Sequence, residues 1–485
     1  MKKYISILLC SAMVTTLSSC GDWFDVNPKT NVKAELLFES ESGFQSALTG
    51  LYVKMTENSN YGKNFTMGYM ERLVQRYDNI TAANKLSIYT YDENIQGSQS
   101  KTIQAAMWMG SYNIIANANN LLKWLDKNGE RVLPDESTRN QMRGEALAVR
   151  AFLHFDLLRC WGPMYRSDST SRAIPYRTII DGSRQPRLPA NKVVSLIVDD
   201  LKAAEELLAH QEGSKLSGIS NQNNRYHFTI HSVRALMARV LNYRNDKEGA
   251  FYYAQRAIEG SNLTLANDQS LIEDPALYCE TLFGLYYYDM SNLMTEWTDS
   301  SPEQTHSYIF LENLQILYAD YNDARYRANL GFLHFPTSTA MGANTAITRK
   351  YVRNQNLIPL IRLAEMYYIM CECAPLNEAD RWMSIVNEQR GLNQSGEFTS
   401  EQQRIDALDS EYCKEFYAEG QYFHFLKLHE RTTFTFCPLE NGMTKKQYIF
   451  PLPDDEVEYG WIEGSDEDED TDTDTDNDGE GQDAE

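Results

Sequence analysis

The chain has 485 residues, of which 42% are hydrophobic, and its 45 basic and 68 acidic side chains give a formal net charge of −23. This length and apolar content suffice for one large or two medium domains with a packed core, so a fibrous or wholly disordered chain is not expected. The acidic balance argues against nucleic acid or an anionic membrane surface as a partner, because both attract clustered Lys and Arg.

Residues 1–19 have the features of a secretion signal. Two lysines precede the apolar run 5–14, which is too short to span a bilayer, and small residues follow it. The stretch Leu17-Ser18-Ser19-Cys20 resembles a bacterial lipobox, in which the cysteine is acylated and becomes the first mature residue. We therefore expect a lipoprotein anchored through Cys20; the alternative is an ordinary signal with a stray cysteine.

Helical periodicity dominates the mature chain, because apolar residues recur every three or four positions. The pattern predicts helices over residues 42–56, 103–125, 147–158, 193–208, 357–374, 378–390 and 400–428. The third of these ends at Gly162-Pro163, a pair that stops helices.

Residues 231–260 predict a pair of helices joined by a turn at Asn245-Asp246. Alanines occupy the positions where the two helices would face each other, so their axes can approach closely. This is the pattern of a tetratricopeptide-type hairpin. The alanines are Ala235, Ala238, Ala250, Ala254 and Ala257.

Two stretches, 58–99 and 262–354, are rich in Tyr, Asn, Ser and Pro and are predicted to be mainly loops. Within the second, residues 281–287 and 308–311 are candidate strands. Loops on a helical scaffold are where binding residues usually lie.

Five stretches of the chain form a recognisable set: GEALAVRAFLHFDLLR at residues 144–159, and residues 108–122, 360–368, 419–421 and 450–453. Together they resemble the RagB/SusD nutrient-uptake lipoproteins of Bacteroidetes. The chain departs from the family at Tyr422, where Arg is common, at Phe425-Leu426-Lys427, where Asp-Leu-Lys/Arg is common, and in its acidic tail.

The resemblance implies a mainly α fold, a tetratricopeptide-like helix-pair scaffold with loop-rich ligand-binding insertions. Residues 20–225 and 226–462 would form one compact unit, followed by a disordered acidic tail at 463–485. The protein would sit on the outer face of the outer membrane and deliver an oligosaccharide, or a peptide in some members, to a TonB-dependent SusC-like β-barrel. It implies no enzymatic activity and no cofactor or metal.

Sugar binding needs flat aromatic faces for C–H surfaces and polar groups for hydroxyls. Trp297 is the leading candidate, because polar residues surround it in the sequence and burial there is least natural. For each tyrosine, packing in the core is the alternative. By resemblance, the ligand-binding candidates are Asp78, Tyr89 and Tyr91 in the first loop region and Tyr286, Tyr288 and Trp297 in the second.

Other motifs have weaker support. His227 and His231 are spaced for a metal but lack the Glu of a zincin. Residues 474–485 match a calcium-binding loop, yet Gly481 stands where an apolar anchor is needed, so a solvated acidic tail is the preferred interpretation. A glycan-degrading lipoprotein and a structural scaffold remain alternative functions.

Overall fold

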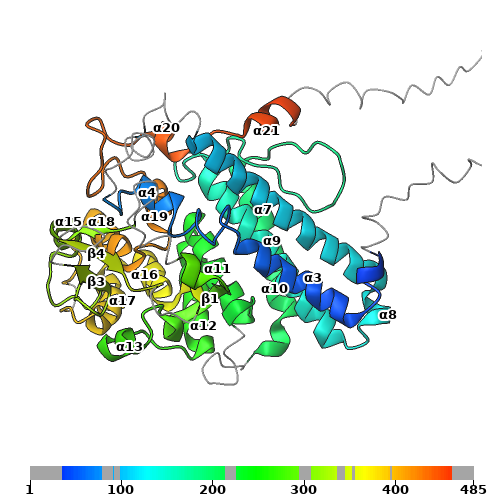
Figure 1. Cartoon of the computed structure of the whole chain (residues 1–485), viewed down its shortest axis with the longest axis horizontal. Helices are drawn as coiled ribbons and strands as arrows, with labels where there is room; N and C mark the ends of the chain where they lie inside the picture. Colours follow the sequence, from blue (N-terminus) through cyan, green and yellow to red (C-terminus); the bar gives the residue numbers. More distant parts are fainter. Residues whose placement is uncertain are drawn as a thin grey trace, which may run out of the picture.

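The computed structural model describes residues 35–78, 91, 99–212, 225–293, 307–335, 344–351, 356–393 and 396–460. The signal at 1–19, Cys20 and the tail at 463–485 lie outside these ranges, so what the sequence predicts for them stays a prediction. The described chain is rich in helix and poor in strand, which confirms the mainly α fold (Figure 1). None of its helices combines the length and apolarity needed to cross a membrane.

Long helices packed side by side form the N-terminal half (Figure 1). α9 (Glu136–Trp161) lies between α7 (Gln99–Trp124) and α10 (Ala190–Leu207), and α3 (Glu41–Met55) packs on α7 and α9. All four predicted helices of this half are present. The shorter elements are α4 (Tyr69–Leu73), the π-helical turn η1 (Leu125–Gly129), α8 (Glu130–Val132) and the 3-10 turn η2 (Ala209–Gln211).

The predicted helix pair is confirmed as α11 (Ile230–Tyr243) and α12 (Lys247–Ser261). Asn245 takes a left-handed φ of 64° in the turn between them, a conformation that Asn tolerates better than most residues. The five alanines of the pair are all fully buried, so the helices pack as closely as their sequence predicts. α12 also packs against α16 (Leu363–Cys373), which joins the pair to the C-terminal half.

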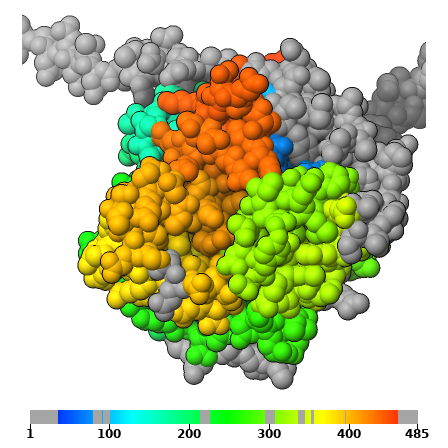
Figure 2. Space-filling view, turned by 90° about the vertical axis from the view of Figure 1, so that its left-hand side faces the viewer, coloured from blue at the N-terminus to red at the C-terminus, as the bar shows by residue number. Residues whose placement is uncertain are grey.

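The C-terminal half combines shorter helices with two small antiparallel sheets. β1 (Thr281–Tyr286) pairs with β5 (Leu357–Arg362), and β4 (Thr345–Thr348) lies between β2 (Ile309–Phe310) and β3 (Phe332–Phe335). Figure 2 shows α15 and the three-stranded sheet in lime beside α17 and α18 in yellow and orange. The helices are α13 (Asp268–Glu273), η4 (Tyr278–Glu280), α15 (Leu311–Tyr318), α16, α17 (Leu376–Gln389), α18 (Glu401–Glu415), α19 (Tyr422–Leu428), α20 (Lys445–Tyr448) and α21 (Asp454–Tyr459).

The helix predicted over 357–374 is wrong in its first part, because residues 357–362 form strand β5. All six residues of β5 are buried and the first five are apolar, so the periodicity of the run does not distinguish strand from helix. Pro359 is the physical signal against a helix, since it lacks an N–H donor and its ring crowds the preceding turn.

The single helix predicted over 400–428 is also wrong, because the chain breaks it between α18 and α19. Gly420 takes a φ of +73°, and a Cβ at this position would lie 2.1 Å from the carbonyl oxygen of Phe65. Only glycine fits both the conformation and the close approach. The strands predicted at 281–287 and 308–311 are confirmed as β1 and β2, and the region 262–354 is otherwise more ordered than expected, since it also contains α13, α15, β3 and β4.

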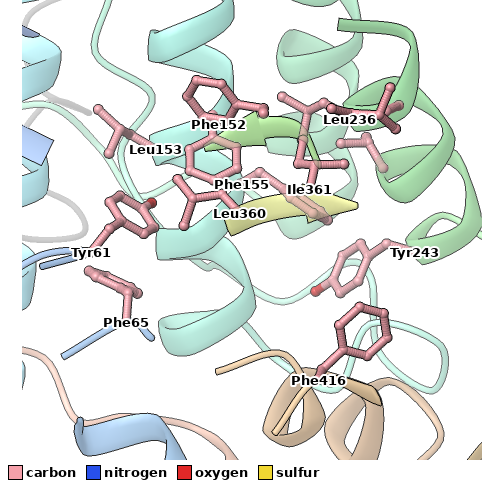
Figure 3. Packing of buried hydrophobic residues seen from close by; sticks show 14 of the residues in the cluster. Tyr61, Phe65, Phe152, Leu153, Phe155, Leu236, Tyr243, Leu360, Ile361 and Phe416 are labelled. Atoms are coloured by element: carbon pink, nitrogen blue, oxygen red, sulfur yellow. The ribbon is translucent and has the colours of Figure 1, made fainter. Parts of the chain in front are cut away.

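A continuous hydrophobic core joins the two halves (Figure 3). Phe152 of α9 lies 5.7 Å from Phe283 of β1 and 5.9 Å from Phe228, measured between ring centroids, and Phe228 and Phe283 stack at 4.0 Å. Figure 3 shows Leu236 of α11 and Ile361 of β5 in the same cluster. Helices and sheet therefore share one core on both sides of residue 225.

A buried network of charges lies where β5, α17 and α18 meet. Glu415 accepts hydrogen bonds from three guanidinium groups: Arg325 Nη1 at 2.9 Å, Arg362 Nη1 at 2.7 Å and Arg390 Nη2 at 2.7 Å. Burial opposes the ionisation of Glu415, but the three arginines hold its pKa well below the usual value. The other carboxylates of this charge network are Glu280, Asp323, Glu411 and Glu419.

We expect acid to destabilise the protein through this charge network. Burial raises the pKa of Glu411, but Arg325 and Lys414 outweigh it and lower the pKa from 4.5 to about 2. The stability that ionised Glu411 contributes is therefore present above pH 4.5 and lost as the pH falls through 2. Urea unfolding at pH 7 and pH 3 measures how much the free energy of unfolding falls on acidification. In Glu411→Gln this fall should be about 2 kcal/mol smaller than in the wild type.

Glu440→Gln is the control for this prediction, because Glu440 is exposed and lies outside the charge network. Its unfolding free energy should change with pH as in the wild type. If the free energy of unfolding fell equally on acidification in Glu411→Gln and in the wild type, the prediction would be contradicted.

Candidate functional site

A group of tyrosine rings lies at the end of strand β1. The side chains of Tyr286 and Tyr288 are 51% and 83% exposed. The ring of Tyr226 approaches Tyr286 edge to face at 5.5 Å and lies 6.3 Å from the ring of Tyr278. We give the name tyrosine cluster to these three contacting rings together with Tyr288, which stands two residues after Tyr286 in the turn that follows β1. The cluster combines solvent-facing aromatic surface with rings that the fold holds in place.

The β1–β5 pair positions the cluster. Tyr286 pairs with Leu357 in the sheet, and the next backbone N–H, that of Tyr287, donates to the carbonyl oxygen of Asn356 at 2.6 Å. The side-chain amide of Asn356 donates to the Tyr286 hydroxyl at 3.2 Å. Tyr286 therefore stands at the last pair of the ladder, fixed on its backbone and at its hydroxyl.

Arg225 holds the inner side of the cluster. Its guanidinium carbon lies 3.9 Å from the centroid of the Tyr278 ring, a cation–π contact, and Nη1 donates to the carbonyl oxygen of the same residue. Burial, with the neighbouring rings of Tyr278 and Tyr286, raises the pKa of Tyr226 to about 12. The Tyr226 hydroxyl therefore keeps its proton near neutral pH and can donate or accept a hydrogen bond.

Asp78 occupies a structural position. Its Oδ2 accepts the backbone N–H of Phe310 at 2.6 Å, and its Oδ1 accepts the side-chain amide of Asn313 at 2.8 Å. Its own N–H donates to the carbonyl oxygen of Tyr308 at 2.9 Å. Burial raises the pKa of Asp78, although the bonds from Phe310 and Asn313 oppose the rise. Both carboxylate oxygens thus tie the chain after α4 to the start of α15.

The remaining predicted residues divide into two groups. Tyr91 is buried, and its hydroxyl donates to the carbonyl oxygen of Leu73 at 2.5 Å, so its ring packs in the core. Trp297, Tyr89 and Cys20 lie outside the described residues, and their roles stay predictions. Of the six ligand-binding candidates, the structure therefore presents Tyr286 and Tyr288 to solvent.

Sequence reasoning missed Tyr226 and Tyr278 as members of the cluster. Tyr226 lies far from Tyr286 along the chain, and only the folding of the segment before α11 against the β1–β5 pair brings its ring beside those of Tyr278 and Tyr286. The sequence did offer one signal, because residues 278–288 are rich in tyrosine. Considering each tyrosine separately does not reveal such a group. His227, considered as a metal ligand, instead contacts Glu145, with 2.9 Å between Nδ1 and Oε2.

Comparison with known proteins identifies relatives of this chain. A family model described as "Starch-binding associating with outer membrane" matches residues 22–241. A SusD-like protein of Formosa agariphila is 24% identical over 528 residues, which cover 93% of this chain and 97% of the relative. Another SusD-like protein of the same organism is 26% identical over 217 residues, 44% of this chain and 40% of the relative.

Solved structures share the fold. A SusD superfamily protein of Bacteroides vulgatus is 19% identical with a TM-score of 0.69, covering 87% of this chain and 97% of its own. One from Bacteroides thetaiotaomicron is 19% identical with a TM-score of 0.67, covering 86% and 98%. A laminarin-binding SusD-like protein is 16% identical with a TM-score of 0.62, covering 87% and 98%.

The geometry of Asp78 predicts a loss of stability in Asp78→Asn. Asparagine offers one oxygen where two N–H donors need acceptors, so one buried donor loses its partner. We expect urea unfolding to show a free energy lower by about 1 to 3 kcal/mol. The exposed Asp199→Asn on α10 is the control and should be neutral. Unchanged stability together with lost ligand binding in Asp78→Asn would instead support the ligand-contacting role predicted from the sequence.

Proposed function

We propose that this chain is a member of the SusD/RagB family, a cell-surface lipoprotein that captures an oligosaccharide through the tyrosine cluster. The observation that supports this most is the pair of solvent-facing rings, Tyr286 and Tyr288, at the end of a fixed strand pair. Such rings cover the apolar C–H face of a sugar, while the cluster's hydroxyls and the Asn356 amide serve its hydroxyl groups. The laminarin-binding neighbour and the starch-binding description of the family model support a glycan as the ligand.

The proposed activity is binding without chemical conversion. The described cluster offers phenol, amide and guanidinium groups with one carboxyl group, Asp274, beside Tyr226 and Tyr278, and a phenol with a pKa of about 12, such as Tyr226, stays protonated near neutral pH and is a poor general base. Glycoside hydrolysis uses two carboxyl groups that flank the scissile bond. Asp78, the carboxylate predicted from the sequence, already has both oxygens occupied by hydrogen bonds within the fold.

We further propose that the protein delivers its ligand to a SusC-like TonB-dependent β-barrel in the outer membrane. The lipobox at residues 17–20 supports an anchor at the membrane surface, and the description of the family model associates its members with the outer membrane. Several acyl chains on Cys20 would hold the protein there without a spanning helix. A peptide in place of the glycan is the alternative within the same family.

Replacing an exposed ring should weaken glycan binding. In Tyr286→Ala and Tyr288→Ala, we expect the dissociation constant for laminarin or soluble starch, whichever binds, to rise roughly three- to tenfold, because a stacking face is lost. Isothermal titration calorimetry on the full chain measures this. Tyr252→Ala is the matched control, because Tyr252 on α12 is also 51% exposed but lies outside the cluster.

The outcomes separate the alternatives. Equal weakening by the Tyr286 and Tyr252 variants would contradict the location of the site. Binding of an oligopeptide mixture, but of no polysaccharide on a glycan array, would favour the peptide alternative. Shortened glycan products after incubation with the chain would show an enzyme and contradict binding alone.

The anchor has its own test. We expect the wild-type chain, expressed in a Bacteroides host, to partition into the detergent phase, and Cys20→Ser to appear in the aqueous phase, because the serine variant cannot receive a thioether-linked lipid. Mass spectrometry of the mature N-terminus gives the modification directly. An unmodified Cys20 in the wild type would contradict the lipoprotein proposal.

A further inference from the structure

The stretch of chain that carries most of the tyrosine cluster is acidic and lacks strongly basic residues. Residues 257–324 contain twelve acidic side chains and neither Lys nor Arg. Three members of the cluster, Tyr278, Tyr286 and Tyr288, lie in this stretch, and Tyr226 comes from outside it. The charge at the cluster therefore depends on the acids near the rings and on the cations that other parts of the chain bring to them.

The cation that the fold brings to the cluster is Arg225, and it faces the inner side. Arg225 is 5% exposed, and its guanidinium carbon lies 3.9 Å from the centroid of the Tyr278 ring. Its Nη1 also donates to the carbonyl oxygen of Tyr278. A guanidinium held in this way orders the ring above it, and an anionic group on a ligand could reach it only by displacing that ring.

Asp274 lies beside the rings. Burial raises the pKa of the Tyr278 phenol, the charge of Arg225 opposes this rise, and the charge of Asp274 adds to it, so the carboxylate lies close to the ring. The Oδ2 atom of Asp274 accepts the backbone N–H of Cys279 at 2.9 Å. This donor is neutral, so it leaves the negative charge of Asp274 in place.

A second carboxylate, Asp289, follows Tyr288 directly in the sequence. Its Oδ1 accepts the side-chain amide of Asn292 at 2.7 Å, which is again a neutral donor. Glu273, next to Asp274, is exposed. Three carboxylates and one cation are thus described around the cluster, and their balance is negative.

The neighbouring sequence does not reverse this balance. Residues 213–224, 294–306 and 352–355 flank the cluster along the chain and lie outside the described residues. Together they contain three acids, one Lys and one Arg. The charge near the rings stays negative when these stretches are included.

We propose that the tyrosine cluster selects uncharged glycans and rejects glycans that carry carboxylate or sulfate groups. This inference rests on the proposed function and narrows the class of ligand at the same site. A sugar that stacks on Tyr286 and Tyr288 brings any anionic substituent towards Asp274 and Asp289. Juxtaposed like charges weaken binding and exclude the wrong partner, whereas phenol and amide groups can hydrogen-bond to neutral hydroxyls.

Calorimetric titration of the full chain with matched polysaccharides tests this proposal. Laminarin and soluble starch are each compared with a carboxymethyl derivative, which adds carboxylates to the same backbone. A hydroxyethyl derivative adds similar bulk without charge. For the glycan that binds, the carboxymethyl derivative should have a dissociation constant about tenfold higher or more at about 10 mM salt. At about 1 M salt the difference should fall below about threefold, because the Debye length shrinks from about 30 Å to about 3 Å. The hydroxyethyl derivative should bind like the parent glycan at both salt concentrations.

Removing one carboxylate should reduce the discrimination. In Asp289→Asn, and separately in Asp274→Asn, we expect the ratio of the two dissociation constants at low salt to fall about two- to threefold. Asp199→Asn on α10 is the control, because it makes the same charge change at an exposed position outside the cluster. Its ratio should equal that of the wild type.

The outcomes separate this proposal from the proposed function. Equal binding of the parent and carboxymethyl glycans at low salt, with both weakened by Tyr286→Ala, would overturn the selectivity and leave the binding site in place. Discrimination that persists at high salt, or that the hydroxyethyl derivative shares, would also overturn it, because bulk would then be the cause. An unchanged ratio in both aspartate variants would assign the repulsion to the net charge of −23 and overturn the role of the site. A chain that binds none of these glycans would contradict the proposed function and this inference together.

Discussion

The charge network around Glu415 is the constraint on which the C-terminal half depends. Three guanidinium groups converge on one buried carboxylate, from strand β5, from the end of α17 and from the loop after α15. Removing water from these charges is costly, and breaking such a group by losing one member commonly costs several kcal/mol. The elements that carry the charges can therefore move only together, so the network fixes the chain path more than it adds net stability.

The tyrosine cluster benefits from this rigidity. Arg362 is the last residue of β5 and belongs to the charge network, while Leu357, the first residue of the same strand, pairs with Tyr286. One strand thus connects the immobile buried charges to the exposed rings. A binding surface built on a fixed strand loses less conformational entropy when a ligand binds than rings on a free loop would lose.

The sequence was informative wherever the cause of structure was local. The stripes of α3, α7 and α10 and the alanine positions of α11 and α12 predicted those helices, because a helix displays its own buried face. β5 was misassigned because both of its faces are buried, and the break before α19 because it depends on Phe65, a distant neighbour of Gly420. The role of Asp78 was hidden for the same reason, since Phe310 and Asn313 meet it only after folding.

Lys427 supplies hydrogen-bond donors to the C-terminal end of α9. The pair Gly162-Pro163 predicted the end of α9, but the sequence does not show which group donates hydrogen bonds to the last carbonyl oxygens of this helix. The Lys427 ammonium donates to the carbonyl oxygens of Arg159, Cys160 and Gly162. Burial lowers the pKa of Lys427 to about 7, yet a cation at this site also complements the negative end of the α9 dipole. Burial disfavours the charge on Lys427, but the ammonium group lies where the end of α9 needs hydrogen-bond donors. These bonds connect α19 to the N-terminal helices.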